Sequence, residues 1–349
     1  MNYLHIIVTF IIVLFIYVHV QFQLTTSDEK DVYILDGIIN IPMEEVFDLK
    51  QPVVMNTFLP SEIDICRNIN KYTIGDNGVK DINIYDNQRT NIHTCVSSSI
   101  TSAIKLFDAD EKSQYYSENN NEYIANTEQI FQDIQKHLSF LIPPLKSSER
   151  KDILFGSNGS TTSLQYSINY RNFFTITNGT LQIKMVHPET IKASGINIKS
   201  DYFNLGFFSD ENVWNNSKIA TIDTTLYAGQ TICIPPYWLY SFKFTNETFV
   251  WSTAYNTYMT DMATIHHKIL QLMHRFTKPT VIPPQKNTND DSSDISESKP
   301  TIDNECDTND SVNQTSDKIE LNDDKNDIND EVKEEKDTLI DSDTSNEIS

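Results

Sequence analysis

The amino-acid sequence predicts a mainly β fold with flanking helices, preceded by a transmembrane helix and followed by a disordered tail. Three features support this: an uncharged apolar run near the N-terminus, a region of short β-prone runs, and a long acidic stretch without aromatic residues. They divide the 349 residues into a transmembrane signal-anchor (1–24), an α/β flank (25–150), a β core (151–257), a C-terminal helix (258–278) and an acidic tail (279–349).

The apolar run Leu4–Val20 carries no formal charge over its 17 residues. A membrane-spanning helix needs about 17–25 such residues. A cleavable signal peptide is the alternative, but Met1–Tyr3 contains no basic residue and Val20–Gln23 contains no small residue for cleavage. The sequence therefore favours an uncleaved anchor through residues 4–20, in a single-pass protein of an endomembrane or virion membrane.

The side of the membrane on which the body lies stays open. Six Asn-x-Ser/Thr sequons would suit a lumenal body, although an Asn-rich chain also produces them by chance: Asn158, Asn178, Asn215, Asn246, Asn309 and Asn313. The four cysteines form no CxxC pair and no Cys/His cluster at zinc spacing: Cys66, Cys95, Cys233 and Cys306. A Cys66–Cys95 bridge in an oxidising lumen and free buried thiols are the two alternatives.

The β core consists of short runs rich in Ile, Thr, Tyr, Phe and Val between Asn, Gly and Pro turns. Evenly spaced short strands predict a β-barrel or jelly roll. The expected strands are Leu164–Tyr170, Phe173–Thr177, Leu181–Val186, Ile219–Leu226, Thr231–Ile234, Tyr240–Phe244 and Thr248–Tyr255. Helical spacing predicts helices over Asn126–Leu141 and Met259–Phe276, and the apolar face of the second would mediate dimerisation or cover the core.

The acidity of the chain belongs to its tail. Residues 287–349 carry a net charge of −16 out of the total of −22, and they contain no Phe, Tyr or Trp. Such a segment cannot bury enough apolar surface to fold, so it is expected to be disordered, either simply solvated or bound to a basic partner. The body shows no basic patch, which argues against nucleic-acid binding. The bias toward Asn, Ile and Asp, with only 9 glycines, is typical of AT-rich genomes such as those of large DNA viruses.

Two stretches of the β core carry a family resemblance. The first reads Gly-Ser-Thr-Thr-Ser-Leu-Gln-Tyr-Ser over residues 159–167 and continues through Asn172-Phe173-Phe174 to Gly179 and Pro188. The second, more specific, reads Leu-Tyr-Ala-Gly-Gln-Thr-Ile-Cys-Ile-Pro-Pro-Tyr-Trp-Leu-Tyr over residues 226–240. Together with the lead-in Pro42–Met55, they resemble the cupin-like, JmjC-related branch of the Fe(II)/2-oxoglutarate dioxygenases over residues 32–275. The resemblance implies a double-stranded β-helix, the jelly-roll or cupin fold.

The resemblance also implies where metal ligands would lie, and this sequence departs from the family at each position. The family places His-x-Asp on one strand and a second histidine after Ile-Pro-Pro-x-Trp-x, forming a facial triad for iron. The second histidine position is Tyr240. The His-x-Asp positions are Gln165 and Ser167, or Tyr166 and Ile168 in an alternative register. The position of the lysine that often binds the co-substrate is Leu181.

These departures predict a non-catalytic protein without metal or cofactor. Polar and aromatic residues around the lost ligands would either line a small pocket or fill the interior: Gln165, Tyr166, Ser167, Tyr170, Asn172, Trp238 and Tyr240, with Leu181 at the former lysine position. Scattered Asp/Glu pairs in the body are interpreted as surface charges.

We expect a membrane-anchored binding or scaffold module. One alternative is an active dioxygenase in which two histidines meet one carboxylate, drawn from His93, His137, His187, His266, His267 and His274. The other is a lumenal carbohydrate- or protein-binding module.

Overall fold

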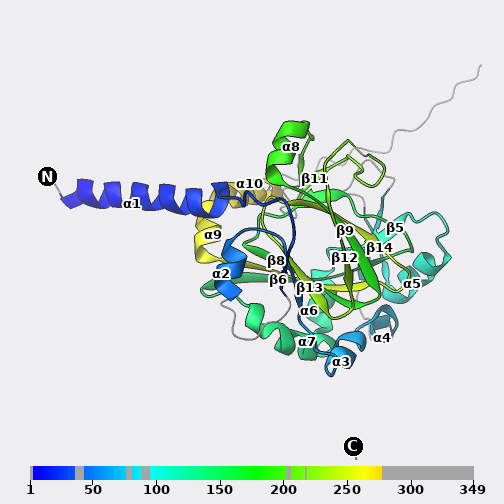
Figure 1. Cartoon of the computed structure of the whole chain (residues 1–349). Helices are drawn as coiled ribbons and strands as arrows, with labels where there is room; N and C mark the ends of the chain where they lie inside the picture. The colour runs from blue at the N-terminus through cyan, green and yellow to red at the C-terminus, as the bar shows by residue number, and fades with distance from the viewer. Residues whose placement is uncertain are drawn as a thin grey trace, which may run out of the picture. The chain divides into compact units, whose positions relative to one another are not determined.

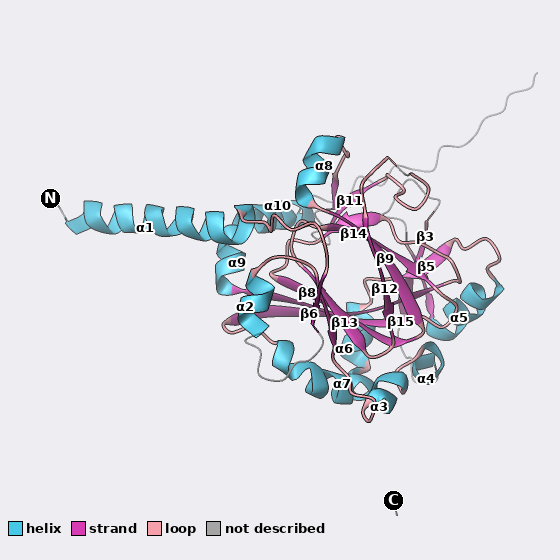
Figure 2. Cartoon of the chain, viewed as in Figure 1, coloured by secondary structure: helices cyan, strands magenta, loops and turns pink. Residues whose placement is uncertain are grey.

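The computed structural model of the chain describes residues 3–35, 43–75, 81–87, 95–201, 206–216 and 218–276. It combines helices with two large, mostly antiparallel sheets and one apolar helix at the N-terminus (Figures 1 and 2). The chain divides into two units, Met1–Ile282 and Pro283–Ser349. The predicted acidic tail lies outside the described residues.

The predicted anchor is a helix. It comprises α1 (Tyr3–His19) and a π-helical turn, η1 (Val20–Leu24). Residues Tyr3–Phe22 are long and apolar enough to cross a membrane, a test that a signal sequence near the N-terminus also passes. The side chains of α1 are almost all exposed, but Val18 near its end is 1% exposed. That end of the anchor is therefore packed against the rest of the chain.

The first sheet has nine strands. In order across the sheet they are β1 (Tyr33–Leu35), β2 (Val53–Asn56), β13 (Gln230–Ile234), β8 (Arg171–Asn178), β15 (Phe249–Thr257), β6 (Lys146–Gly156), β5 (Tyr115–Ser117), β3 (Asp81–Asp86) and β4 (Val96–Ser99). Among the described strands, only β1 and β2 pair in parallel.

The second sheet has six strands. In order they are β10 (Lys199–Asp201), β11 (Gly206–Ser209), β7 (Leu164–Tyr166), β14 (Leu239–Phe244), β9 (Thr180–Val186) and β12 (Ile222–Tyr227). The strands of the β core are thus split between the two sheets, as Figure 1 shows.

The two sheets enclose an apolar interior. Its side chains come from alternate positions of strands in both sheets, as expected when one face of each strand is buried. They include Leu154, Phe174, Ile176, Leu181, Ile183, Ile232, Phe242, Phe244 and Val250. The candidate site lies within this layer.

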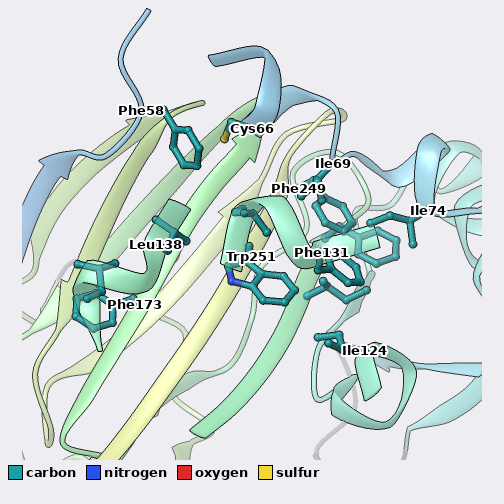
Figure 3. Close-up of a cluster of buried hydrophobic side chains, with 14 of the residues drawn as sticks. Phe58, Cys66, Ile69, Ile74, Ile124, Phe131, Leu138, Phe173, Phe249 and Trp251 are labelled. Carbon is teal, nitrogen blue, oxygen red and sulfur yellow. The ribbon is translucent and has the colours of Figure 1, made fainter. Parts of the chain in front are cut away.

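A second apolar cluster lies between the other face of the first sheet and the helices of the N-terminal flank. Figure 3 shows its centre, where Phe131 stacks on Trp251 at a ring-centroid distance of 4.8 Å. The helices of the flank are α2 (Met43–Asp48), α3 (Ile63–Arg67), α4 (Lys71–Gly75), α5 (Ile100–Ala109), α6 (Asn121–Asn126), η2 (Glu128–Phe131), α7 (Gln132–His137) and η3 (Leu138–Leu141). The last helices of the described chain are α8 (Pro188–Ser194), α9 (Tyr258–Ala263) and α10 (Ile265–Phe276).

Both predicted long helices are interrupted. The helix expected over Asn126–Leu141 breaks at Thr127, whose backbone has a non-helical φ of −122° and whose hydroxyl donates to Tyr123 O. The helix expected over Met259–Phe276 breaks at Thr264, whose hydroxyl donates to Thr260 O. Side-chain hydroxyls that bond to nearby carbonyls compete with the helical pattern in this way.

The three described cysteines, Cys66, Cys95 and Cys233, are free thiols. Cys66 and Cys233 are buried, whereas Cys95 is exposed, so the Cys66–Cys95 alternative is not formed in this structure. Burial raises the pKa of both buried thiols to about 12, which keeps them protonated. Cys306 lies outside the described residues.

Candidate functional site

Gln165 and Tyr240 lie opposite each other on neighbouring strands of the second sheet. They are direct register partners of β7 and β14. The neighbours of Gln165 along β7, Leu164 and Tyr166, belong to an apolar cluster on the outer face of this sheet. Because side chains alternate along a strand, Gln165 points into the interior, where Tyr240 packs at 5.4 Å from the ring of Phe174.

A buried carboxylate completes this pair. The Gln165 Nε2 atom donates a 3.1 Å hydrogen bond to Oε2 of Glu118, which follows β5 and is 5% exposed. Burial raises the pKa of Glu118 to about 7, and the negative charge of Asp152 adds to the rise. The hydrogen bond from Gln165 and the positive charge of Arg150 oppose it. Near neutral pH, both the protonated and the ionised form of the Glu118 side chain are therefore populated.

Asp152 places a second carboxylate beside Glu118. It is half-buried on β6, and its two oxygens each accept a 2.7 Å hydrogen bond, from the backbone N–H groups of Asn119 and Asn120. Burial raises the pKa of Asp152, while Arg150 and these hydrogen bonds counteract the rise. The interpretation of the body's acids as surface charges is wrong for Glu118 and Asp152, because the first sheet folds both into the interior.

The remaining polar partners come from the same part of the first sheet. The Arg150 guanidinium donates to Oδ1 of Asn119, and Nδ2 of Asn119 donates to the Tyr85 hydroxyl at 3.1 Å. Burial is the main cause that raises the pKa of Tyr240, and the negative charge of Glu118 adds to it. The phenol of Tyr240 therefore stays neutral. The amide of Gln165 donates to Glu118, and the phenol of Tyr240 is neutral, so neither position supplies an anionic or imidazole ligand.

The other predicted site residues serve separate contacts. Ser167 turns the chain after β7: its hydroxyl accepts from the Asn169 N–H and its carbonyl accepts from the Tyr237 N–H. Tyr166 stacks on Phe207 at 4.7 Å on the outer face of the second sheet. Ile168 is buried at 4% exposure. Of the proposed ligand positions, the structure brings together only Gln165 and Tyr240.

The predicted pocket residues are spread over the fold. Asn172 Nδ2 donates to Ile234 O at 3.1 Å, and Trp238 Nε1 donates to Lys50 O at 3.2 Å. Leu181 is fully buried in the apolar interior. Tyr170 points toward the base of the anchor, where its hydroxyl donates to Asp48 at 3.1 Å. Because the buried polar groups of Asn172 and Trp238 bond to backbone carbonyls, these side chains fill the interior and do not line a pocket.

The described histidines make packing and capping contacts. His137 Nε2 lies 2.8 Å from Thr57 O, and His187 Nε2 lies 2.8 Å from Ser27 O. His267 packs edge-on against a ring of β11 and lies beside His266 on α10. His93 and the side chain of His274 lie outside the described residues. Within the described part of the chain, no three His, Cys, Asp or Glu side chains are grouped so that they could hold a metal ion.

Four of the sequons fall on described turns and loops. Asn158, Asn215 and Asn246 are exposed, and Asn178 is half-buried in the β8–β9 turn. Asn309 and Asn313 lie outside the described residues. Comparison with protein-family models and with curated proteins finds no match to this chain.

Proposed function

We propose that this chain is a membrane-anchored, non-catalytic cupin-like protein that acts as a binding or scaffold module. The observation that carries the proposal is the pairing of Gln165 with Tyr240 next to Glu118. At the positions where the dioxygenases of the resembling family hold iron, this chain has an amide that donates to the buried Glu118 and a neutral phenol on the neighbouring strand.

Strand order supports the double-stranded β-helix. Eight strands run β13-β8-β15-β6 across the first sheet and β7-β14-β9-β12 across the second. Along the chain they alternate between the sheets, except at the centre, where β9 and β12 pair directly. Crossing back and forth between two four-stranded antiparallel sheets is the arrangement expected of a jelly roll.

The anchor and the tail support a tethering role. Tyr3–Phe22 meets the length and composition of a membrane span, which supports a single-pass anchor, and we propose an endomembrane or virion membrane as its location. The acidic segment of residues 287–349, with its net charge of −16, would recruit a basic protein partner.

Rebuilding the triad tests the proposal. The triple variant Gln165→His, Ser167→Asp and Tyr240→His is expected to bind Co²⁺ or Fe²⁺, whereas the full-length parent in detergent binds neither. The reason is that Gln165 and Tyr240 are register partners, and that position 167 follows position 165 at the His-x-Asp spacing of the resembling family. Metal content and the visible spectrum of Co²⁺ measure the binding.

The alternative register supplies the matched control. This control variant combines Tyr166→His, Ile168→Asp and Tyr240→His, and so carries the same types of new ligand. Because position 166 faces outward, the variant is expected to bind no metal. Retention of stoichiometric iron by the parent, or turnover of 2-oxoglutarate, would contradict the non-catalytic assignment. A folded triple variant that binds no metal would contradict the assignment of the ligand positions.

A lumenal carbohydrate- or protein-binding module is the second candidate, favoured by the exposure of Asn158, Asn215 and Asn246. It predicts that the chain isolated from its host migrates more slowly on a gel than the unmodified chain, and that glycosidase treatment removes this mobility shift. Removing the three exposed sequons with Asn→Gln changes should reduce the same shift, and removing Asn178, Asn309 and Asn313 as well should abolish it. An untreated chain that already migrates like the triple variant would place the body away from the glycosylating lumen.

A further inference from the structure

The C-terminal helix pair exposes apolar side chains instead of burying them. On α10, Ile265, Ile269 and Leu272 are 48%, 51% and 54% exposed, and Phe276 is 80% exposed. Their spacing of three or four residues places them on one helix face. Met262 on α9, 43% exposed, continues the series. A helix on the surface of a soluble domain normally turns such a stripe toward the core.

The polar residues of the same helix make its contacts with the body. The ring of His267 packs edge-on against Phe207 at 5.1 Å, and Lys268 Nζ bonds to Asp261 at 2.5 Å. Between them, these contacts hold α10 to α9 and to β11. The orientation of the helix is therefore set by its polar side, and the apolar stripe faces outward.

This stripe is continuous with the base of the anchor. Helix α9 packs against both α1 and η1, and α10 packs against α9; Figure 1 shows the end of α1 beside α9. Val18, in the last turn of α1, is buried there, whereas the rest of the helix is exposed as a membrane span requires. The apolar face of α9 and α10 thus begins where the chain leaves the predicted bilayer.

Charge favours a lipid surface over a second copy of this acidic chain. The two helices contain the basic residues Lys268 and Arg275 against the single acid Asp261, although the whole chain has a net charge of −22. A basic amphipathic helix is the type of segment that lies in the headgroup region, with its apolar side chains toward the acyl chains. Two copies of a chain with this charge would repel each other.

We infer that α9 and α10 lie on the surface of the bilayer that α1 enters and so fix the body against the membrane. The inference rests on the proposed membrane anchor. Since α9 follows the C-terminal end of β15, the end of the core that carries Ser167 and Tyr237 would face the lipid. The β14–β15 turn would face away, at the other end of the nine-residue strand β15, roughly 30 Å distant at about 3.3 Å per residue.

A fluorescent label at three single positions tests this in the full chain, placed in nanodiscs of phosphatidylcholine and phosphatidylserine. Cys95→Ser and Cys306→Ser remove two reactive thiols, and the buried Cys66 and Cys233 remain. Leu272→Cys reports on α10, Phe10→Cys reports on the anchor, and Asn246→Cys in the β14–β15 turn is the control. Nitroxide-labelled lipid is expected to quench the labels at 272 and 10 several-fold more than the label at 246.

The outcomes separate the two ideas. If lipid quenches the label at residue 10 but quenches the label at residue 272 no more than the one at residue 246, the docking of α10 is overturned and the anchor is retained. Absence of quenching at 10 would overturn the anchor and this inference together. Cross-linking of Leu272→Cys between two chains, with no quenching by lipid, would show a dimer interface instead and would also overturn the inference.

Discussion

Replacing Glu118 with glutamine is expected to stabilise the folded body above neutral pH and to flatten its pH dependence. Burial raises the pKa of Glu118 from 4.5 to about 7, so the folded state holds this proton more tightly than the unfolded chain. The parent protein therefore loses stability as the pH rises from 4.5 through about 7 and keeps it below that window. At about 1.4 kcal/mol per pKa unit, the loss amounts to at most about 3 kcal/mol.

The glutamine keeps an oxygen that can accept from Gln165 but carries no charge to desolvate. Thermal unfolding of the full chain across this pH window measures the effect, and Glu122→Gln, at an exposed position of α6, is the matched control. Because burial also raises the pKa of Asp152, some loss of stability with rising pH should remain in Glu118→Gln. If the stability of the parent and of Glu118→Gln changed with pH in the same way, ionisation of Glu118 would have no free-energy cost in the folded state.

This carboxylate also bears on what the site can do. A charge left unpaired in an apolar interior is costly, and a bound cation would remove that cost. Here the cost is relieved by a proton, by the amide of Gln165 and by the charge of Arg150. The buried charge is thus compensated by groups of the protein itself, which is consistent with a scaffold rather than with an open metal centre.

Local patterns predicted the long apolar helix near the N-terminus and most strands of the core. The apolar run Leu4–Val20 lies in α1 and η1, and the expected strand Thr231–Ile234 lies within β13. These predictions were accurate because period and composition are read over a few neighbouring residues. The expected strand Leu164–Tyr170 is shorter, ending at Tyr166, because the hydrogen bonds of Ser167 turn the chain.

Strand β6 was not among the expected strands. Its first part, residues 146–151, reads Lys-Ser-Ser-Glu-Arg-Lys and carries no β signal of its own, yet it pairs with Thr253–Thr257 of β15. Tertiary pairing overrides weak local preference in such a segment. The resemblance to a known family supplied a fold expectation that these residues alone would not have given.

The polar cluster could not be predicted from the sequence. Glu118 is 47 residues away from its partner Gln165, and it lies in the flank that showed only a mixed pattern. Neither Glu118 nor Asp152 stands at a spacing that distinguishes it from a surface acid. Only the pairing of β5 with β6 brings their segments together. Interactions of this kind depend on sheet assembly, which a single sequence does not encode in any short window.

Replacing Arg171 with methionine is expected to lower the free energy of unfolding by about 2 kcal/mol, the usual scale for losing hydrogen bonds to a charged group. Arg171 begins β8 and is 3% exposed. Its two terminal nitrogens donate to both oxygens of Glu44 on α2, at 3.0 and 2.6 Å, and its guanidinium stacks on the rings of Phe47 and Tyr170. Methionine fills part of the volume but loses both kinds of contact.

The same change should loosen the connection between the core and the anchor. Tyr170, stacked on Arg171, contacts the ring of Phe22 in η1 at 5.9 Å, and the Lys50 amine donates to Gln21 O at 2.7 Å. Chemical denaturation measures the stability, and limited proteolysis of residues 25–32 measures the release of the body from the anchor.

A double-mutant cycle with Glu44→Gln isolates the ion pair. Glu44→Gln alone leaves a buried guanidinium with Asp48 at 3.8 Å as its remaining carboxylate, whereas Arg171→Met leaves Glu44 at 49% exposure, where water can solvate it. The double variant should therefore cost less than the two single changes added together, because neither partner is left charged and buried. Strictly additive effects would mean that Arg171 acts through its ring contacts alone, and unchanged proteolysis in Arg171→Met would mean that the anchor is held by other residues.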